Sequence, residues 1–373
     1  MKKLGFGLMR LPLTDPNNNK SVDEAAVLQM MREFIDNGFT YFDTAYMYHR
    51  YTSENVVGRT LVKNFPRESY TLADKLPTMF LKVSEDMPRI FEEQITKCGV
   101  DYFDYYMLHD INASNYDATA QRLSAFEFIS RLKAEGRVRE IGFSFHDGEE
   151  LLERILTDHP EVDFVQLQIN YLDWEDEGVQ AKRCYECATR HGKKVIVMEP
   201  VKGGTLANVP ADAEALFKGY APDASVASWA IKFAASLPNV MVVLSGMSNF
   251  EQLRDNMSYM KDFTPLCDEE YAVIDSAVKV IRDAVEVPCT ACGYCLEGCP
   301  MKIAIPKYFT LYNTEKLLGY CGFSSNAGYY FNIAENFGKA SECIECGLCE
   351  EACPQHLKIR EHLKDVAKYF EKK

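Results

Sequence analysis

Two side chains that could move a proton lie five residues apart near the start of the chain. Asp43 ends the β-rich run 40–42, and the phenol of Tyr48 follows after a short turn. A carboxylate and a phenol placed in this way can meet at one mouth of a barrel, where barrel enzymes hold their reacting groups. The alternative is a buried strand with a capping Asp43 and an ordinary surface Tyr48.

Two later strand ends favour the chemical interpretation. Lys75 stands at the end of a strand-like segment that begins at residue 70, and His109 closes the run 102–110. Neither residue type is a preferred helix cap, so capping explains them poorly. Together with Asp43 and Tyr48 they suit the protonation of an oxygen that gains negative charge.

Each member of this set has a physical role. Tyr48 would donate the proton, and the ammonium of Lys75 would lower the phenol pKa from about 10 toward the working pH. Asp43 would keep Lys75 charged and in place, and a neutral His109 would orient the carbonyl oxygen. Loss of any one should slow proton transfer by roughly 10²–10⁴.

Alternating strands and helices must position these residues. We count eight strand–helix alternations in the first 260 residues, which predict a parallel sheet closed into an α/β (β/α)8 TIM barrel. A helix capped by Ser21, with Glu24 three residues on, and one capped by Ser53 belong to this series. The predicted strands are 4–9, 40–43, 70–73, 102–110, 138–143, 164–168, 195–200 and 240–246. The other predicted helices are 83–98, 119–135, 148–158, 176–191, 223–235 and 249–260, with 268–283 packed outside.

Polar residues fall on one side of this layout. Six of them lie at or just past the carboxyl end of a predicted strand, and Arg10 lies just beyond the first strand. The six are Asp43, Lys75, His109, Ser144, Gln168 and Glu199. Capping of the next helix is a fair alternative for Ser144 alone.

At this point the sequence resembles the aldo-keto reductase family over roughly residues 1–260. The segments that carry the resemblance are DTAYMYHRYTSENVVGR, TLADKLP, YYMLHD, IGFSFH, VQLQINY, EPVKGG and SGMSNFEQLRDNM. The resemblance implies a catalytic tetrad of Asp43, Tyr48, Lys75 and His109. It also implies an NADP or NAD cofactor. No GxGxxG motif is present, so a Rossmann domain has no support.

The resemblance places the cofactor along several segments of the chain. Ser144 and Gln168 would contact the carboxamide, and 200–204 would follow the pyrophosphate, where Lys202 supplies a cation beside unobstructed backbone. The full expected cofactor set is Arg10, Asp43, Ser144, Gln168, Glu199, Pro200, Lys202, Gly203, Gly204, Gly246, Ser248, Gln252 and Asn256.

Two departures from the family pattern bear on the cofactor. Phe145 and His146 follow Ser144 where the family usually has Asn, so His146 either replaces the amide donor or faces solvent. Gln252 stands where an Arg is often found, and Arg254 is the only cation of that segment before Lys261. Because a 2′-phosphate favours a bidentate Arg, the choice between NADP and NAD stays open.

Composition excludes several classes of protein. The net charge is 41 − 55 = −14, which argues against a nucleic-acid or anionic-membrane partner. Arg10 and Pro12 interrupt the first apolar run, so it fails as a signal peptide, and no 18-residue apolar run exists. Thirteen cysteines without such a signal predict a reducing cytoplasm and metal ligation.

Eight of the cysteines form a doubled CxxCxxCxxxCP run after residue 287. It matches the bacterial two-cluster ferredoxin pattern, in which the fourth cysteine of each run serves the other cluster. We therefore assign Cys289, Cys292, Cys295 and Cys353 to one [4Fe-4S] cluster, and Cys343, Cys346, Cys349 and Cys299 to a second. Two four-thiolate zinc sites are the alternative. The predicted domains are a barrel, 1–285, and a small ferredoxin-like domain, 286–373.

The remaining cysteines and the insert between the runs are less informative. Cysteines 98, 184, 187, 267 and 321 read as core or surface thiols. The aromatic-rich insert 300–342 either folds over the barrel mouth and shapes the substrate pocket or only joins the two domains. Deletion of 319–338 without a change in substrate affinity would rule out the pocket.

The favoured function is NAD(P)H-dependent reduction of an aldehyde or ketone, or the reverse alcohol oxidation. The clusters would relay electrons from a ferredoxin or flavoprotein partner, sense redox state, or only stabilise a small module. One alternative is an iron–sulfur electron-transfer protein whose barrel binds nicotinamide without carbonyl turnover. Another is a non-catalytic regulatory barrel. The intact tetrad counts against both.

Overall fold

The structure is a computed structural model with two compact units, each described here by itself. It describes residues 2–16, 18–176, 179–283, 286–287, 289, 293–318, 325–353 and 356–371. The first unit comprises 1–174, 180–200 and 228–266, and the second comprises 175–179, 201–227 and 267–373. Among the described residues, no helix combines the length and apolar character that crossing a lipid bilayer requires.

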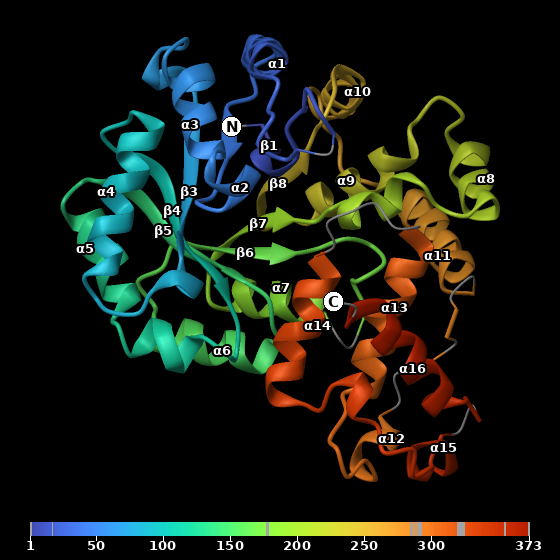
Figure 1. Ribbon diagram of the computed structural model, residues 1–373. Helices are drawn as coiled ribbons and strands as arrows, with labels where there is room; N and C mark the ends of the chain where they lie inside the picture. Colours follow the sequence, from blue (N-terminus) through green and yellow to red (C-terminus); the bar gives the residue numbers. More distant parts are fainter. Residues whose placement is uncertain are drawn as a thin grey trace. The chain divides into compact units, whose positions relative to one another are not determined.

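The first unit is a closed barrel of eight parallel strands in the order of the sequence, which confirms the predicted fold class. Neighbouring strands are in parallel register all the way round, including β1 with β8 (Figure 1). The strands are β1 Leu4–Gly7, β2 Tyr41–Asp43, β3 Thr71–Pro77, β4 Phe103–Ile111, β5 Val138–Phe145, β6 Phe164–Gln168, β7 Lys194–Met198 and β8 Val240–Gly246. Because all eight run the same way, their carboxyl ends meet at one mouth.

Helices cover the outside of the strands in this unit (Figure 1). The longer ones are α1 Glu24–Asp36, α4 Asp86–Cys98, α5 Ala125–Ala134, α6 Glu149–Asp158, α7 Ala181–Arg190, α9 Val226–Ser236 and α10 Phe250–Met260. Shorter elements are η1 Leu8–Arg10, α2 Tyr48–Tyr51, α3 Ser53–Val57, η2 Gly58–Val62, η3 Arg67–Ser69, η4 Thr78–Phe80 and η5 Tyr116–Gln121. The first two residues of α9 belong to the second unit.

The interior of the barrel is a packed core. Fully buried side chains that point inward include Tyr41, Met107, Phe164, Ile196 and Val242. Gly142 of β5 shows how tight this packing is, since a Cβ there would lie 2.3 Å from the carbonyl oxygen of Phe164. The barrel therefore offers its chemistry at the mouth, and the strand ends carry it.

Two predicted helix starts were wrong. Helix α1 is capped by Asp23, whose side chain accepts from the amide of Ala26 at 3.0 Å, and Ser21 lies two residues earlier. Ser53 is the first residue inside α3, and its hydroxyl pairs with that of Thr44 at 2.9 Å. A side chain caps only where its oxygen reaches an amide two or three residues on, and backbone geometry decides that position.

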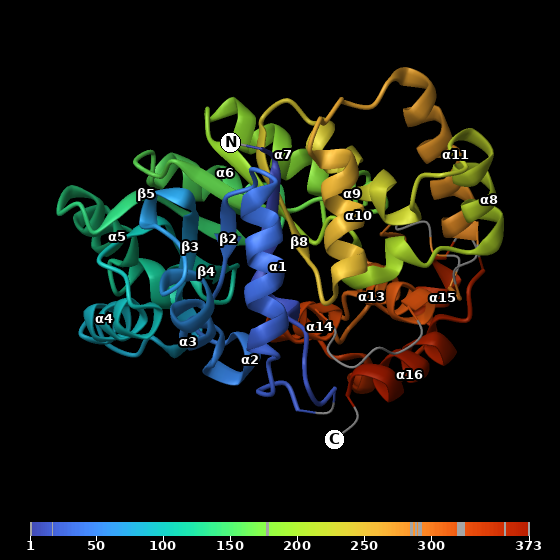
Figure 2. The ribbon, with the colours of Figure 1, turned by 90° about the horizontal axis from the view of Figure 1, so that it is seen from above.

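The second unit is mainly helical. It contains η6 Lys202–Ala207, α8 Ala211–Tyr220, α11 Asp268–Asp283, α12 Tyr294–Glu297, α13 Ile305–Leu318, α14 Ser325–Asn336, η7 Ala340–Glu342, α15 Leu348–Glu351 and α16 Ile359–Phe370. Figure 2 shows α13 beside α14 and α16, and these helices contact one another. Helices α8 and α11 also pack together.

Aromatic rings form much of the core of the second unit. The Tyr330 ring lies 4.6 Å from the Tyr308 ring and stacks at 4.9 Å on Phe370. Tyr308, Phe309, Tyr312 and Tyr330 are buried, whereas Phe331 and Phe337 are exposed. Several aromatics of the predicted insert thus stabilise this unit itself. The hypothesis that part of the insert covers the barrel mouth stays a prediction, and residues 319–324 lie outside the described residues.

Candidate functional site

A buried ion pair lies at the mouth of the barrel. The ammonium of Lys75, which is fully buried in β3, donates to Asp43 Oδ1 and to the carbonyl of Thr44 at 2.6 Å. The amide of Gln166 donates to the other oxygen of Asp43 at 3.3 Å. Burial acts to lower the pKa of Lys75, but Asp43 and then Tyr48 outweigh it, so this pKa lies above its ordinary value. Lys75 therefore carries a fixed positive charge.

Tyr48 lies next to this charge. The Nζ of Lys75 lies 5.0 Å from the centre of the Tyr48 ring. Desolvation raises the phenol pKa above 10, and Lys75 opposes this rise without reversing it. The expectation that Lys75 brings the phenol pKa toward the working pH was therefore wrong, because desolvation dominates. The phenol is protonated at neutral pH and can donate its proton.

His109 faces Tyr48 from β4. The two rings are almost perpendicular, at 83°, with centroids 6.1 Å apart. Burial, Lys75 and His146 lower the pKa of His109 well below its usual value, so the imidazole is neutral, as expected. Among the described residues, its buried Nδ1 has no hydrogen-bond partner. An orphaned buried nitrogen of this kind indicates a place for a ligand.

The turn that follows Tyr48 is strained, which the sequence did not predict. His49, Arg50 and Tyr51 all have left-handed backbone, with φ of 50°, 51° and 70°. Each such non-glycine residue costs of order 1–2 kcal/mol, so the surrounding structure must hold the turn. The sequence signal is weak, because no glycine marks these positions.

Buried His49 supplies part of that hold. Its Nε2 accepts from the amide of Leu11 at 3.2 Å, so its Nδ1 carries the proton and donates to the carbonyl of Asn19 at 2.9 Å. Burial lowers the pKa of His49, which keeps the acceptor nitrogen unprotonated. His49 therefore ties the turn that bears Tyr48 to the segment after Arg10.

The predicted carboxamide-binding residues lie at the ends of neighbouring strands. The hydroxyl of Ser144 accepts from the amide of Asp110 at 2.8 Å, so it retains its own proton to donate. His146 lies 3.9 Å from the Asp110 carboxylate, and burial lowers the pKa of its imidazole. His146 is partly buried, with 19% of its side chain exposed, and whether it replaces the amide donor stays a prediction.

Gln168 is oriented by two residues that the sequence did not single out. Its Nε2 donates to Asp173 at 2.8 Å, and Asn170 donates to the same carboxylate oxygen at 2.7 Å. The amide of Asn170 also lies 3.2 Å from the carbonyl of Glu199. These hydrogen bonds fix the orientation of the Gln168 side chain. Its amide nitrogen points to Asp173, so its carbonyl oxygen is the atom that can accept a hydrogen bond from a ligand.

The residues predicted to surround the adenosine come together at the end of β8. A Cβ on Gly246 would lie 3.2 Å from the Arg10 side chain, and Ser248 donates to the Arg10 carbonyl at 2.8 Å. The side chain of Gln252 accepts from the Ser248 amide at 2.7 Å. Asn256 instead donates to Ser245 at 2.9 Å and is buried.

Arg254 is not poised for a 2′-phosphate in this structure. Its guanidinium pairs with Glu33 through two contacts of 2.8 and 3.1 Å on the surface. A phosphate would have to compete with that carboxylate. Such an exposed pair is worth no more than about 1 kcal/mol, so competition is feasible.

The predicted pyrophosphate segment spans the two units. Pro200 ends a stretch of the first unit, and Lys202, Gly203 and Gly204 belong to the second. These three residues have positive φ angles of 48°, 65° and 109°. Gly203 and Gly204 adopt such a backbone without penalty, whereas Lys202 does not. Their role at a cofactor stays a prediction.

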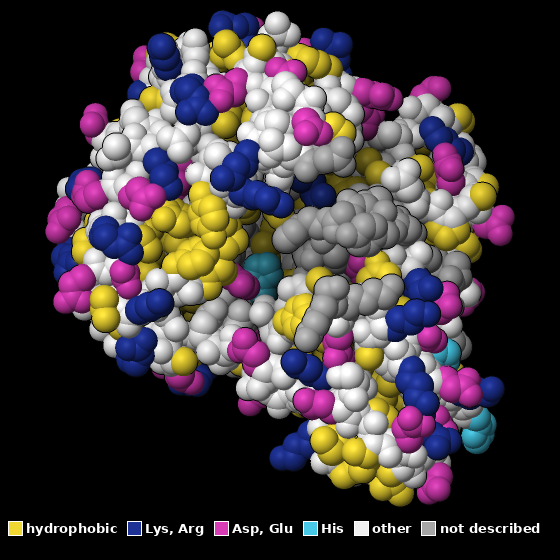
Figure 3. Space-filling view, in the orientation of Figure 1, with side chains coloured by type: hydrophobic (Ala, Val, Ile, Leu, Met, Phe, Trp, Pro, Cys, Tyr) yellow, Lys and Arg dark blue, Asp and Glu magenta, His cyan; other side chains and the backbone are white. Residues whose placement is uncertain are grey.

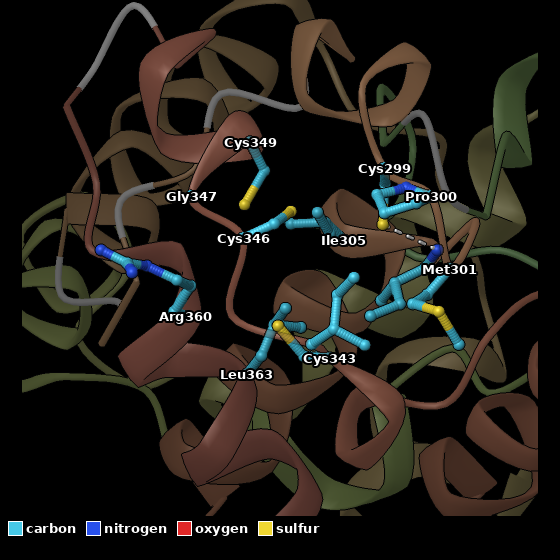
Figure 4. A pocket seen from close by; sticks show the side chains of 12 residues that line it. Cys299, Pro300, Met301, Ile305, Cys343, Cys346, Gly347, Cys349, Arg360 and Leu363 are labelled. Carbon is cyan, nitrogen blue, oxygen red and sulfur yellow. Dashed lines mark hydrogen bonds between the residues drawn. The ribbon is translucent and has the colours of Figure 1, made fainter.

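One pocket of the second unit is lined by four cysteines from two separate sequence runs. Cys299, Cys343, Cys346 and Cys349 all line this pocket, and Figure 4 shows their side chains around it. Apolar side chains and Arg360 complete the wall. Cys299 Sγ also accepts from the amide of Ile303 at 3.4 Å. This is the crossed set assigned from the sequence pattern.

A second pocket mirrors the first. Cys289, Cys295 and Cys353 line it. Cys292, the fourth predicted ligand, lies outside the described residues. The glycine after each CxxC, Gly293 and Gly347, has left-handed backbone with φ of 79° and 86° and starts a short helix. The described parts of the two runs therefore share this turn.

The donor chemistry of these pockets fits iron–sulfur clusters. The doubled CxxCxxCxxxCP run is the ligand pattern of two-cluster ferredoxins, whereas four-thiolate zinc sites need no such repeat. Burial and neighbouring thiols raise the pKa of Cys349 to about 11. A bound metal must therefore displace the thiol proton. Within the described residues, Cys98, Cys184 and Cys187 are buried and Cys267 is exposed; Cys321 lies outside them.

The chain thus combines a closed parallel barrel, with titratable residues at its mouth, and a cysteine-rich helical unit. The chain belongs to the aldo/keto reductase family, whose model matches residues 3–279. A second model, described as a 4Fe-4S dicluster domain, matches residues 288–357.

Curated relatives agree with the family. An uncharacterized oxidoreductase, YqkF, of Bacillus subtilis is 24% identical over 309 residues, which cover 75% of this chain and 93% of YqkF. A probable aldo-keto reductase 1 of Glycine max is 30% identical over 153 residues, which cover 39% of this chain and 41% of the soybean protein.

Solved structures share the barrel fold. The holo form of an aldo-keto reductase from Bacillus halodurans has a TM-score of 0.59 and 23% identity, with 74% of this chain and 91% of that chain covered. An aldo-keto reductase from Klebsiella pneumoniae in complex with NADPH has a TM-score of 0.57 and 22% identity, with 74% and 90% covered.

Proposed function

We propose that this chain reduces an aldehyde or ketone, or runs the reverse alcohol oxidation, with Tyr48 as general acid. The observation that carries the proposal is the position of Lys75 Nζ, 5.0 Å from the centre of the Tyr48 ring and held there by a buried ion pair with Asp43. When hydride reaches a carbonyl carbon, negative charge grows on the oxygen. A proton donor beside a cation stabilises that charge at the moment it forms.

The other members of the tetrad support this step. Asp43 holds the ammonium of Lys75 in position, and the neutral imidazole of His109 can hydrogen-bond the substrate oxygen without competing for the proton. Tyr48 and His109 are partly exposed, so a substrate can reach them, whereas Lys75 and Asp43 are buried behind them. Tyr48 and His109 would therefore contact the substrate, whereas Lys75 and Asp43 would set their electrostatic surroundings.

A nicotinamide cofactor, when bound, supplies the hydride. We propose that Ser144 and Gln168 hold the carboxamide, and that Arg10, Gly246, Ser248, Gln252 and Asn256 surround the adenosine. NADP is the favoured form, since a similar Klebsiella structure contains NADPH. Glu199 and the segment 200–204 would complete the set.

The rim of the barrel unit suits a substrate with an apolar part. Tyr46, Tyr51 and Phe80 contact one another with ring centroids 5.6–6.1 Å apart. Met79 and Val83 are also exposed, and hydrophobic side chains gather on the surface of this unit (Figure 3). Tyr46 and Tyr51 adjoin Tyr48 in sequence and Phe80 packs on both, so these rings can shield the apolar side of a carbonyl compound from water.

We further propose two [4Fe-4S] clusters in the second unit, with Cys299 and Cys353 exchanged between the two runs. Such clusters carry one electron each and would connect the chain to a ferredoxin or flavoprotein, or report redox state. A reducing cytoplasm suits these thiolates. The domains would then be 1–285 and 286–373, in keeping with family matches that end at 279 and begin at 288.

The test is an anaerobic assay of NADPH and NADH oxidation with a panel of carbonyl compounds. Tyr48→Phe should lose roughly 10²–10⁴ in rate while nicotinamide binding persists. Tyr102→Phe, which lies before β4 at the end away from the mouth and is bonded to Arg139, is the matched control. If both variants keep full activity, the proposed acid is wrong. Cluster reduction by NADPH that survives Tyr48→Phe, without carbonyl turnover in the wild type, would favour an electron-transfer protein.

A further inference from the structure

We propose that Glu153, Cys187 and His191 form a binding site for one divalent ion of the zinc type on the outside of the barrel. All three residues belong to the first unit. They lie away from the barrel mouth in sequence, on helices that follow β5 and β6, and the proposed reaction does not use them. The ligand class follows from the donors, which are a thiol, an imidazole and a carboxylate.

Two packed helices bring the donors together. Cys187 and His191 are four residues apart at the end of α7, so they project from the same face of that helix. Glu153 reaches them from α6, which packs against α7. The donor atoms all lie within 4.8 Å of one another.

The spacing of the donors already resembles a coordination shell. Cys187 Sγ lies 3.4 Å from one oxygen of Glu153, and His191 Nε2 lies 2.8 Å from the other. Metal–ligand bonds of about 2.0–2.3 Å in a tetrahedron put neighbouring ligand atoms about 3.3–3.8 Å apart. Only small side-chain adjustments would therefore place one ion at bonding distance from all three.

Burial leaves one side of the cluster open. Cys187 is fully buried, whereas the side chains of His191 and Glu153 are 22% and 44% exposed. An ion can therefore enter from solvent and keep water as a fourth ligand. His191 follows the last residue of α7, where the helix dipole favours positive charge.

The protonation states of the three donor side chains determine how many protons a metal ion must displace when it binds. Hydrogen bonds from His191 and Arg190 lower the pKa of Glu153 to about 2, so its carboxylate is ionised. Burial and the bond to Glu153 raise the pKa of the Cys187 thiol to about 12. Binding would form an S–metal bond, break the S–H bond and release one proton to the buffer.

Arg190 is the competing cation. Its guanidinium lies 3.0 Å from Glu153 and 2.6 Å from Glu149. Because Glu149 can retain it and the side chain is 55% exposed, Arg190 can release Glu153 without losing its charge partner. Removal of this cation should strengthen metal binding, whereas a purely structural cluster predicts no such gain.

The test uses anaerobic holoenzyme, with free Zn²⁺ fixed by a nitrilotriacetate buffer. After unbound metal is removed, zinc and iron per chain are counted by mass spectrometry. Wild type should hold one more zinc ion than the variant Cys187→Ser/His191→Ala, with unchanged iron, and should release one proton per ion. Cys184→Ser, one turn earlier on α7, is the matched control and should keep the zinc.

A second variant keeps the proposal falsifiable if the double variant does not fold. Arg190→Gln leaves all three donors in place and should tighten zinc binding by roughly two- to fivefold, the size expected for one screened surface charge. Equal zinc in wild type and Cys187→Ser/His191→Ala would overturn the site. So would zinc that enters only as iron leaves, or an Arg190→Gln variant with unchanged affinity.

Discussion

The ammonium of Lys75 lies over the ring of Tyr48, 5.0 Å from its centre, while its hydrogen bonds go to Asp43 and to the carbonyl of Thr44. Lys75 is therefore half of a buried ion pair. Its positive charge also acts to lower the phenol pKa of Tyr48. Stability and chemistry are linked through this one side chain.

Lys75→Met should destabilise the barrel by about 3–5 kcal/mol, because it leaves the Asp43 carboxylate buried without its partner. Asp43→Asn in the same background should recover much of that loss by removing the unpaired charge. The free energy of unfolding of the two single variants and the double variant gives the coupling directly. Additive losses would show that the pair does not act as a unit.

The pH profile should follow the raised pKa of Tyr48. Reduction requires the protonated phenol, so its single-turnover rate should persist through neutral pH and fall only as pH rises past about 10. The reverse oxidation requires the phenolate and should rise over the same range. Rates measured from pH 6 to 10.5 would contradict this assignment if reduction declined near pH 7.

His109 should contribute to acid sensitivity. Its pKa is lowered in the folded protein, so below about pH 6.5 the unfolded chain binds a proton that the folded chain does not. Wild-type stability should therefore fall relative to His109→Gln as pH decreases, by up to about 1.4 kcal/mol per pH unit. Denaturant unfolding at pH 5, 6 and 7 measures the difference, and parallel curves would refute it.

Paired cysteine substitutions distinguish crossed from sequential ligation. Cys299→Ser with Cys346→Ser removes two ligands from the same pocket, so the other cluster and about four iron atoms should remain. Cys299→Ser with Cys295→Ser damages both pockets and should remove nearly all iron. Sequential ligation predicts the reverse order, and iron analysis of anaerobically purified protein decides between them.

Gly142 should not tolerate a side chain. Gly142→Ala places a Cβ 2.3 Å from the carbonyl oxygen of Phe164, so the strands must shift at a cost of about 1–3 kcal/mol. Gly219→Ala is the control, since nothing lies within 4 Å of its added Cβ in α8 and a gain of about 0.4–1 kcal/mol is expected. Thermal unfolding of both variants compares them, and equal midpoints would show that β5 can yield.

The barrel and the position of Asp43, Lys75 and His109 on its strands could be predicted because most of the apolar runs end at a polar residue; the catalytic roles of these side chains stay a prediction. In a parallel barrel all those ends share one mouth, so the order of Asp43, Lys75 and His109 along the chain was enough. The exchange of Cys299 and Cys353 between the two pockets could also be predicted, because the cysteine pattern is specific. In the structure Cys299 lines the pocket of the second run, and Cys353 lines the pocket of the first.

Other features depend on contacts that no local pattern encodes. The left-handed turn at His49 is held by Leu11 and Asn19, which are distant in sequence. The phenol pKa of Tyr48 depends on how far the fold excludes water, and composition does not report that. Asp173 orients Gln168 only because the loop after β6 folds back on itself.

The exchange of cysteines also constrains how the protein matures. The pocket that holds Cys289 and Cys295 includes Cys353, and the pocket that holds Cys299 includes Cys349. Neither pocket has its full set of cysteines until the ribosome has translated the second cysteine run. On the proposed ligation, iron delivery follows translation of the entire barrel, and a nascent chain stalled within the second run would present thiols whose partner ligands are not yet made.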